Sequence, residues 1–282
     1  RPRMRGARMA GSAGKRWNNR LCYNFQMQKL FIVGNWKQNP KNLKEASLLA
    51  SSIDKEIPKN NKFEVVIASP SIFIPDLSKR KGTKKFSLSL QDFPLTKDGA
   101  NTGEIPVKAF SSFGVKYAIV GHSEVRKRGD TNEIVAEKVS NVLSEKIIPI
   151  LCVGEKERQD DSSYFSFVRE QIEAVIKINP SFGRGGFIAY EPVWAIGKGA
   201  TRSATSYEFE EMIIFIQKVV SDLTKGKGKV QILYGGSVDE KNSLEFLSVR
   251  GSGGLLIGRA SLNAKQFTKI CQIAKEISIK KV

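Results

Sequence analysis

Three residues with complementary chemistry, Lys37, His122 and Glu191, each stand at or just after the end of a short apolar stretch. If these stretches are parallel strands of one sheet, their carboxyl ends lie on the same side and bring the three side chains together. A carboxylate can take a proton from carbon, an imidazole can donate one to oxygen, and a cation can offset the negative charge that develops. The pattern predicts acid/base chemistry on a small molecule.

Further polar and glycine residues stand at the same kind of position. Asn35 and Glu124 lie close to two of these residues in the chain, one apolar stretch ends in YGGS with Ser237, and another ends in Gly258 and Arg259. Glycine turns after the last strands of a barrel let backbone N–H groups approach a phosphate closely. The sequence therefore predicts a phosphorylated substrate.

Each of the three residues also has a structural interpretation that the residues alone leave open. His122 is the only histidine of the chain, and a lone histidine often serves structure, but it also excludes a metal site built on several histidines. Lys37 could be a solvated surface charge. Glu191 could cap a helix or pair with an arginine.

Other motifs do not predict a function here. The segment GKGAT at 197–201 lacks the earlier glycine of a P-loop, and Gly183, Gly185 and Gly186 lack the spacing of a dinucleotide-binding loop. Ser237 has no second histidine to activate it, so a serine nucleophile is not expected.

The organisation of the chain predicts the elements that position these residues. Eight apolar stretches rich in Val, Ile or Leu alternate with amphipathic helical patterns, as parallel strands buried on both faces do. The predicted strands are 30–36, 63–69, 86–92, 116–122, 147–154, 186–191, 230–236 and 254–258. Since no linker interrupts them, we expect residues 27–282 to form one α/β domain, a closed (β/α)8 barrel with eight parallel strands and eight outer helices. A doubly wound open sheet is the main alternative.

Charge is unevenly distributed along the chain. The 282 residues carry a formal net charge of +18, and residues 1–26 hold seven basic residues and no acidic one. This leader lacks apolar periodicity, whereas Met27 opens the segment MQKLFIVGNWK, which contains the first predicted strand. We expect residues 1–26 to be a basic, disordered extension, derived from upstream sequence or a tag, with Met27 as the native start. Their Arg-rich, acid-free composition also resembles an organelle transit peptide.

Composition further restricts the class of protein. The longest apolar segment, 211–223, carries charge at both ends and is too short to predict a membrane span. Cys22, Cys152 and Cys271 are few, odd in number and far apart, which predicts reduced thiols rather than a disulfide framework or a zinc site. We expect a cytoplasmic protein.

Five motifs together carry a family resemblance. Over about residues 28–278 the sequence resembles the triosephosphate isomerase family in the order and spacing of its motifs, which are GNWK at 34–37, TGE at 102–104, VGHSE at 120–124, AYEPVWAIG at 189–197 and YGGS at 234–237. The resemblance implies interconversion of D-glyceraldehyde 3-phosphate and dihydroxyacetone phosphate through an enediolate, in glycolysis and gluconeogenesis. It implies no metal and no organic cofactor.

The resemblance also implies roles for residues. Glu191 would be the base that moves the proton, and neutral His122 would donate to the two substrate oxygens in turn. Lys37 would offset the developing charge, Asn35 would orient the substrate, and Glu124 would support Lys37. Backbone N–H groups would hold the phosphate, from Gly197, Ser237, Gly258 and Arg259.

Two segments of the resemblance concern access and assembly. Residues 192–201 resemble the family's closing loop, and Ile196 and Leu256 match apolar residues that exclude water from the base. The family is typically a homodimer, and residues 98–106 match the loop that reaches the partner, with Thr102 as the intruding residue.

The sequence departs from the family's pattern in three places near the site. GKGATRSATS at 197–206 is two residues longer than the family's GTGKTATP and lacks its proline. Val125 stands where arginine is usual, and Arg259 where a second glycine is frequent.

Two rival functions remain from the sequence. Another phosphate-binding barrel isomerase or lyase would share the glycine turns but not the set of Lys37, His122 and Glu191. A basic protein that binds RNA or an anionic surface would account for the net charge, although no aromatic and basic motif of a known RNA-binding module is present. We expect a small phosphorylated triose substrate, a homodimer, no membrane partner and no specific nucleic acid.

Overall fold

The computed structural model describes residues 29–59, 62–80, 85–95, 99–158, 161–197, 200 and 202–280. The predicted N-terminal extension, residues 1–26, lies outside this range.

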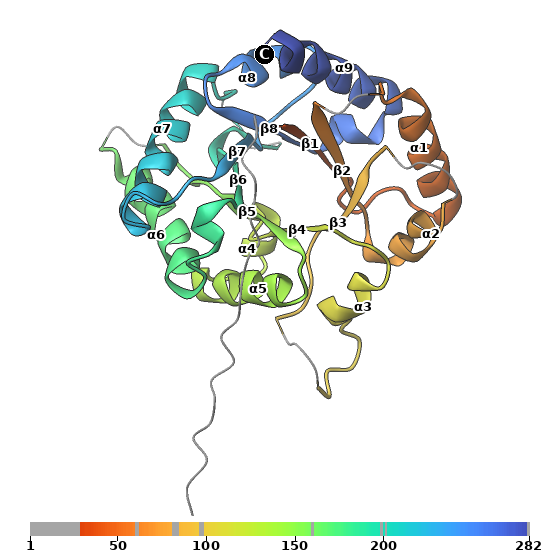
Figure 1. Ribbon diagram of the computed structural model, residues 1–282, viewed down its shortest axis with the longest axis horizontal. Coiled ribbons are helices and arrows are strands. Elements are labelled where there is room, and N and C mark those ends of the chain that lie inside the picture. Colours follow the sequence, from red (N-terminus) through yellow and green to blue (C-terminus); the bar gives the residue numbers. More distant parts are fainter. Residues whose placement is uncertain are drawn as a thin grey trace, which may run out of the picture.

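Eight parallel strands form a closed barrel, in which each strand pairs with the next along the chain and the last pairs with the first. The strands are β1 (Leu30–Asn35), β2 (Phe63–Ala68), β3 (Ser87–Leu90), β4 (Tyr117–Val120), β5 (Ile148–Val153), β6 (Phe187–Tyr190), β7 (Gln231–Tyr234) and β8 (Ser252–Ile257). Seen along its axis, the barrel is enclosed by a ring of helices (Figure 1). The predicted closed barrel is confirmed, and the open-sheet alternative is wrong.

A helix follows every strand. The α-helices are α1 (Leu43–Glu56), α2 (Ile74–Ser78), α3 (Val107–Ser111), α4 (Ser123–Arg126), α5 (Asn132–Ser144), α6 (Ser163–Ile178), α7 (Ser206–Leu223), α8 (Ser243–Ser248) and α9 (Ala264–Lys280). Short 3-10 turns are η1 (Ser71–Phe73), η2 (Phe182–Arg184), η3 (Val193–Ala195) and η4 (Arg259–Leu262). The eight predicted outer helices are therefore present, and α4 is an additional single turn between β4 and α5.

The alternation of side chains along the strands divides the core into two layers. In β1, Phe31 and Val33 point into the barrel, where they pack with inward side chains of other strands such as Phe187. Leu30 and Ile32 belong to the larger cluster between the strands and the helices. Burying an aliphatic or aromatic side chain stabilises the fold by about 1.5–3 kcal/mol. Both faces of the sheet are thus apolar, which explains the unbroken apolar stretches of the sequence.

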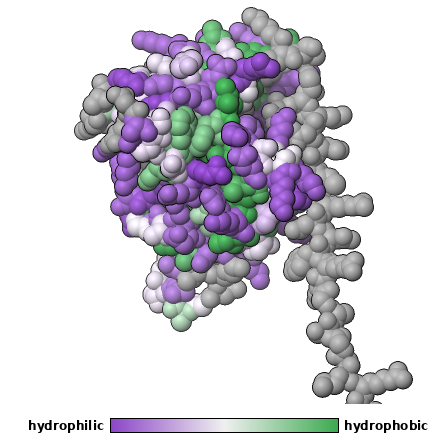
Figure 2. Space-filling model, turned by 90° about the vertical axis from the view of Figure 1, so that its left-hand side faces the viewer, coloured by the Kyte–Doolittle hydropathy of each residue, from purple (hydrophilic) through white to green (hydrophobic). Residues whose placement is uncertain are grey.

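Three of the longer outer helices, α1, α5 and α7, begin at a residue whose side chain caps the helix. Thr205 caps α7: its side chain accepts a hydrogen bond from the Glu208 N–H, and the Glu208 carboxylate accepts one from the Thr205 N–H. The side with α6 and α7 is mainly hydrophilic, with a hydrophobic strip across it (Figure 2). Among the residues that the structure describes, no helix is both long enough and apolar enough to cross a membrane.

Candidate active site

His122 and Glu191 meet at the carboxyl ends of β4 and β6. The His122 Nε2 atom lies 3.0 Å from Glu191 Oε1, and Glu191 Oε2 accepts a hydrogen bond of 2.9 Å from the Ser123 N–H. Their relative exposures are 7% for His122 and 3% for Glu191. A buried carboxylate with both oxygens occupied is stabilised in its charged form.

The hydrogen bonds of His122 assign its proton. It precedes α4, and its Nδ1 atom accepts a 3.1 Å hydrogen bond from the Glu124 N–H. An Nδ1 atom that accepts carries no proton, so the proton is on Nε2, facing Glu191. The imidazole is therefore neutral and presents a donor to the centre of the site.

The two side chains shift each other's pKa. Burial lowers the pKa of His122, but the charge of Glu191 and the hydrogen bond to it outweigh burial, so the pKa is raised. Burial raises the pKa of Glu191, but the charge and hydrogen bond of His122 and the Ser123 N–H outweigh it, so the pKa is lowered. Glu191 is thus ionised at neutral pH. We assign the neutral imidazole beside it, because the Glu124 amide opposes a proton on Nδ1.

Lys37 is held beside this pair by contacts on its backbone and side chain. Its φ of +51° lies in the left-handed region, where a residue other than glycine costs about 1–3 kcal/mol and needs support from its surroundings. Its N–H donates to Oδ1 of the buried Asn35 at 3.0 Å, and its Nζ donates to Glu124 Oε1 at 2.6 Å. Its charge lowers the pKa of both His122 and Glu191. The structure therefore brings the five predicted polar residues together.

Two glycines allow the close packing around Glu191. A Cβ atom on Gly154 would lie 1.7 Å from the carbonyl oxygen of Glu191, and one on Gly235 would lie 3.0 Å from its Cγ atom. The strand ends at these two positions must lack side chains for the carboxylate to take its observed place.

Gly235→Ala is expected to lower kcat strongly and to change the melting temperature little. The new methyl group presses on the Glu191 side chain, and a displacement of about 1 Å at a reacting group can cost about 10²-fold in rate. Activity and melting temperature of the variant check this. An unchanged kcat in a folded variant would show that the position of Glu191 tolerates this displacement.

The predicted phosphate-binding residues lie around the same mouth of the barrel. Gly197, Ser237 and Arg259 are exposed, and a Cβ on Gly258 would lie 3.7 Å from Lys37 Cε. The Ser237 hydroxyl donates to the Ala195 carbonyl at 3.3 Å, which connects the turn after β7 to η3. Within the described residues, the backbone N–H groups of Ser237 and Arg259 donate to no other protein group.

The other predicted residues differ in their placement. Leu256 is buried inside the barrel, and Ile196 is half-buried directly after η3. Thr102 is exposed and lies in the connection from β3 to α3, which projects beyond the helix ring (Figure 1). The structure does not bring Thr102 to this chain's own His122 and Glu191. Of the predicted closing loop, residues 198, 199 and 201 lie outside the described range.

Comparisons with known proteins agree with this geometry. The family model described as triosephosphate isomerase matches residues 30–274. The chain belongs to the triosephosphate isomerase family. The triosephosphate isomerase of Vesicomyosocius okutanii is 36% identical over 257 residues, covering 87% of this chain and 99% of the relative. That of Dehalococcoides mccartyi is 37% identical over 260 residues (90% and 100%), and that of Shewanella loihica is 34% identical over 261 residues (88% and 98%).

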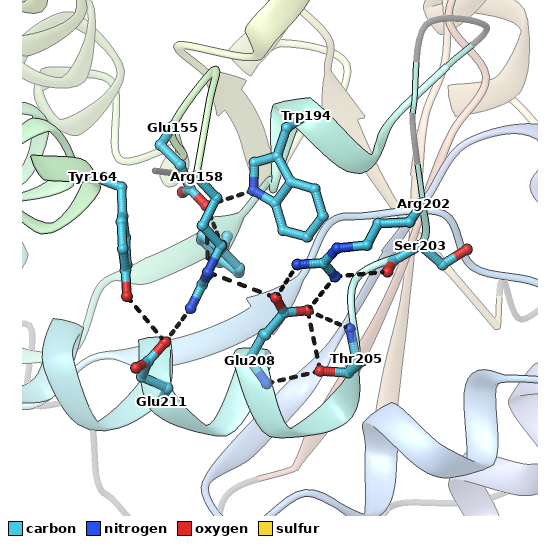
Figure 3. Close-up of polar contacts among 10 residues, drawn as sticks. Glu155, Arg158, Tyr164, Trp194, Arg202, Ser203, Thr205, Glu208 and Glu211 are labelled. Atoms are coloured by element: carbon cyan, nitrogen blue, oxygen red, sulfur yellow. Dashed lines mark hydrogen bonds and ion pairs between the residues drawn. The ribbon is translucent and has the colours of Figure 1, made fainter. Parts of the chain in front are cut away.

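The structure reveals one functional candidate that the sequence analysis missed, Glu155. This buried residue follows β5, and its Oε1 atom accepts hydrogen bonds of 2.7 Å from Tyr190 Oη and from Trp194 Nε1 (Figure 3). Burial raises the pKa of the Glu155 carboxyl. A carboxylate directly after the fifth apolar stretch was the available signal. In this family member, Glu155 anchors Trp194, the third residue of the predicted closing loop.

The segment that departs from the family's pattern contributes Arg202 to the same network. Its guanidinium donates to both carboxylate oxygens of Glu208, at 3.0 and 2.6 Å. It also lies over the Trp194 ring at 4.4 Å from the centroid. Figure 3 shows Arg202 between the indole and the first turn of α7. Arg202 thus connects Trp194, which lies within the predicted closing loop, to the first turn of α7.

Arg158 continues the network on the other side of Glu208. It lies 3.6 Å from both Glu155 Oε1 and Glu208 Oε1, and it pairs with Glu211. Its guanidinium stacks over the Tyr164 ring at 4.4 Å (Figure 3). Glu208 is therefore held between two arginines, Arg158 and Arg202.

Glu208→Gln is expected to remove a pH-dependent part of the stability. Hydrogen bonding to Arg202, followed by hydrogen bonding to Thr205, lowers the pKa of Glu208 to about 2 despite its partial burial. A lowered pKa stabilises the folded state above the ordinary glutamate range near pH 4.3, and this contribution is lost as the pH falls toward about 2. Urea unfolding at pH 7, 4 and 3 should show the difference between wild type and variant shrinking with pH. A constant difference would contradict the assignment.

Within the described residues, no three His, Cys, Asp or Glu side chains gather in an arrangement that could hold a metal ion.

Proposed function

We propose that this chain interconverts D-glyceraldehyde 3-phosphate and dihydroxyacetone phosphate, as an aldose–ketose isomerase of glycolysis and gluconeogenesis. The observation that carries the proposal is the contact between an ionised, buried Glu191 and the Nε2 proton donor of His122, 3.0 Å apart. A base and a neutral donor side by side are what proton transfer between adjacent carbons requires.

Proton transfer begins when the Glu191 carboxylate releases His122 Nε2 and the Ser123 N–H and contacts the substrate instead. It takes a proton from C1 of dihydroxyacetone phosphate, while His122 Nε2 gives its proton to the oxygen on C2. His122 then recovers a proton from the oxygen on C1, and Glu191 returns its proton to C2. Lys37 offsets the negative charge on the oxygens in between, and Asn35 orients the substrate.

The phosphate binds to backbone N–H groups of Gly197, Ser237, Gly258 and Arg259. Support comes from their place around the mouth of the barrel and from the proximity of Gly258 to Lys37. Because a backbone N–H serves this purpose with any side chain, arginine at position 259 does not prevent it.

Ile196 and Leu256 exclude water from the base. An enediolate phosphate exposed to water can eliminate its phosphate, so the intermediate must be protected. A desolvated carboxylate is also a stronger base, since water no longer stabilises its charge.

The chain acts as a cytoplasmic homodimer in which Thr102 reaches the partner's site. The exposed, projecting connection from β3 to α3 supports this arrangement. Light scattering of the purified chain tests it: a monomer at micromolar concentration would contradict the proposal.

The proposed reaction is tested by supplying D-glyceraldehyde 3-phosphate to the purified chain and coupling the product to a reductase specific for dihydroxyacetone phosphate. We expect turnover in the presence of EDTA, because no residue role requires a metal. Release of inorganic phosphate, or no turnover at millimolar substrate, would favour a lyase or another barrel isomerase.

A further inference from the structure

The positive charge of the barrel is concentrated at one end. Because all strands are parallel, connections from a strand to the next helix share the end that holds Glu191, and connections from a helix to the next strand share the opposite end. Among the described residues, the latter connections, together with Lys29 before β1, carry thirteen basic residues and one acidic residue, Glu145. The connections at the Glu191 end, with α4 included, carry ten of each. We call the basic end the helix-to-strand end.

Six exposed cations of the helix-to-strand end have no carboxylate close to them. Within the described part of the chain, no carboxylate lies within 4.0 Å of the side-chain nitrogens of six exposed residues, which are Lys59, Lys116, Lys146, Arg184, Lys225 and Lys227. Their charges therefore act together on the solvent side of this end.

Acidic residues at the nearby helix ends already have other partners. Asp54 accepts a hydrogen bond from the backbone N–H of Lys85 at 2.7 Å, and Glu56 accepts one from the Thr268 hydroxyl at 3.1 Å. The carboxylate of Asp222 pairs with basic side chains of the outer helices α6 and α7. These three carboxylates keep their negative charge, but with Glu145 they are only four acids against the thirteen basic residues of the connections.

The same end is hollowed beside β2 and β3. A hollow of about 640 Å³ is lined by residues that include Lys59, Lys85 and Lys116. Glu64 also lies on its wall, where its carboxylate accepts hydrogen bonds from Ser87 Oγ at 2.9 Å and Tyr117 Oη at 3.0 Å and offsets one of the three lysine charges. A convex or rod-shaped anion can thus approach several lysines at once.

We propose that the helix-to-strand end binds the phosphate backbone of double-stranded nucleic acid without reading its sequence. Ten of the thirteen cations are lysines, which act as point charges on phosphates rather than as bidentate readers of bases. The described connections expose no large hydrophobic side chain. Single strands are usually bound by stacking on aromatic residues, and stable membrane attachment needs an apolar anchor besides charge. This site does not depend on the proposed isomerase chemistry.

Charge reversal at spread positions tests the proposal on the full chain. The test variant carries Lys116→Glu, Arg184→Glu and Lys227→Glu, and the matched control carries Lys44→Glu, Lys265→Glu and Lys269→Glu on the exposed faces of α1 and α9. Both variants have the same net charge, and both keep residues 1–26. Neither the net charge nor the leader can therefore explain a difference in binding between them. Melting temperature and isomerase activity should be unchanged in both.

Fluorescence anisotropy of labelled 20-base-pair RNA and DNA duplexes is then measured at several salt concentrations from 50 to 200 mM. We expect the test variant to bind both duplexes at least about 10-fold more weakly than wild type. In a plot of the logarithm of the binding constant against the logarithm of the salt concentration, the slope for this variant should be less steep than that of wild type. The difference should be about 0.9 for each phosphate that the variant no longer neutralises. The control should stay within about threefold of wild type.

Three results would overturn the proposal. Equal weakening in both variants would indicate a general charge effect, and unchanged binding in the test variant would place the binding elsewhere, including in residues 1–26. Binding to phosphatidylserine vesicles but to neither duplex would identify a lipid surface instead.

Discussion

Glu191→Asp lowers kcat by roughly 10²-fold or more while leaving the barrel folded. Aspartate keeps the charge but withdraws the carboxylate by about 1 Å from the carbon whose proton it takes, and reaction rates depend steeply on such distances. Glu191 is buried and its carboxylate accepts a hydrogen bond from the Ser123 N–H. The shorter aspartate therefore cannot easily move to restore the lost distance. Steady-state kinetics in both directions check the effect.

Glu64→Asp is the matched control for this variant. Like Glu191, Glu64 has a carboxylate that accepts two hydrogen bonds from other residues. It lies near the beginning of β2, at the opposite end of the barrel. The same removal of one methylene there should leave kcat within about twofold of wild type. A near-normal rate in Glu191→Asp, or an equal decrease in both variants, would refute the role of Glu191 as the base.

His122→Gln has the second large effect, again about 10²-fold or more in kcat. Glutamine can donate a hydrogen bond, but its amide does not exchange protons with two oxygens as an imidazole does. A smaller effect on KM than on kcat is expected, because the proposed phosphate contacts do not involve His122. Wild-type kcat in this variant would exclude His122 from proton transfer.

The protonation of His122 can be read directly, since it is the only histidine of the chain. Nitrogen-15 chemical shifts at neutral pH should show a neutral ring protonated on Nε2. In Glu191→Gln, the pKa of His122 should fall below its wild-type value, because the charge that raises it has been removed. A cationic ring at neutral pH in the wild type would contradict the assigned neutral donor.

Much of the fold could be predicted from the sequence because its signals are local and repeated. The stretch at 63–69 is apolar throughout, as a strand buried on both faces must be, and the helical pattern at 207–223 appears as α7, Ser206–Leu223. Once the barrel was predicted, parallel strands placed Lys37, His122 and Glu191 at one end. The contact between Lys37 and Glu124 followed from the family resemblance rather than from spacing.

What could not be predicted depends on contacts between distant segments. The sequence does not indicate that Ser123 holds Glu191 through its backbone, since any residue supplies an N–H group. Nor does it indicate that Glu155 binds Trp194 or that Arg202 stacks on that indole, because three different connections must first be brought together. The uneven charge of the two barrel ends appears only when the connections are sorted by direction.

In the proposed reaction, Glu191 carries a proton between adjacent carbons of a triose phosphate, and proton NMR in deuterium oxide can follow this transfer. Wild-type protein supplied with D-glyceraldehyde 3-phosphate should form dihydroxyacetone phosphate that carries deuterium on C1. The deuterium comes from the solvent, because the proton exchanges with it while Glu191 holds that proton. Glu191→Gln should slow both product formation and deuterium entry by at least about 10²-fold. No dihydroxyacetone phosphate above the uncatalysed rate, or equal deuterium entry in the variant, would contradict this role of Glu191.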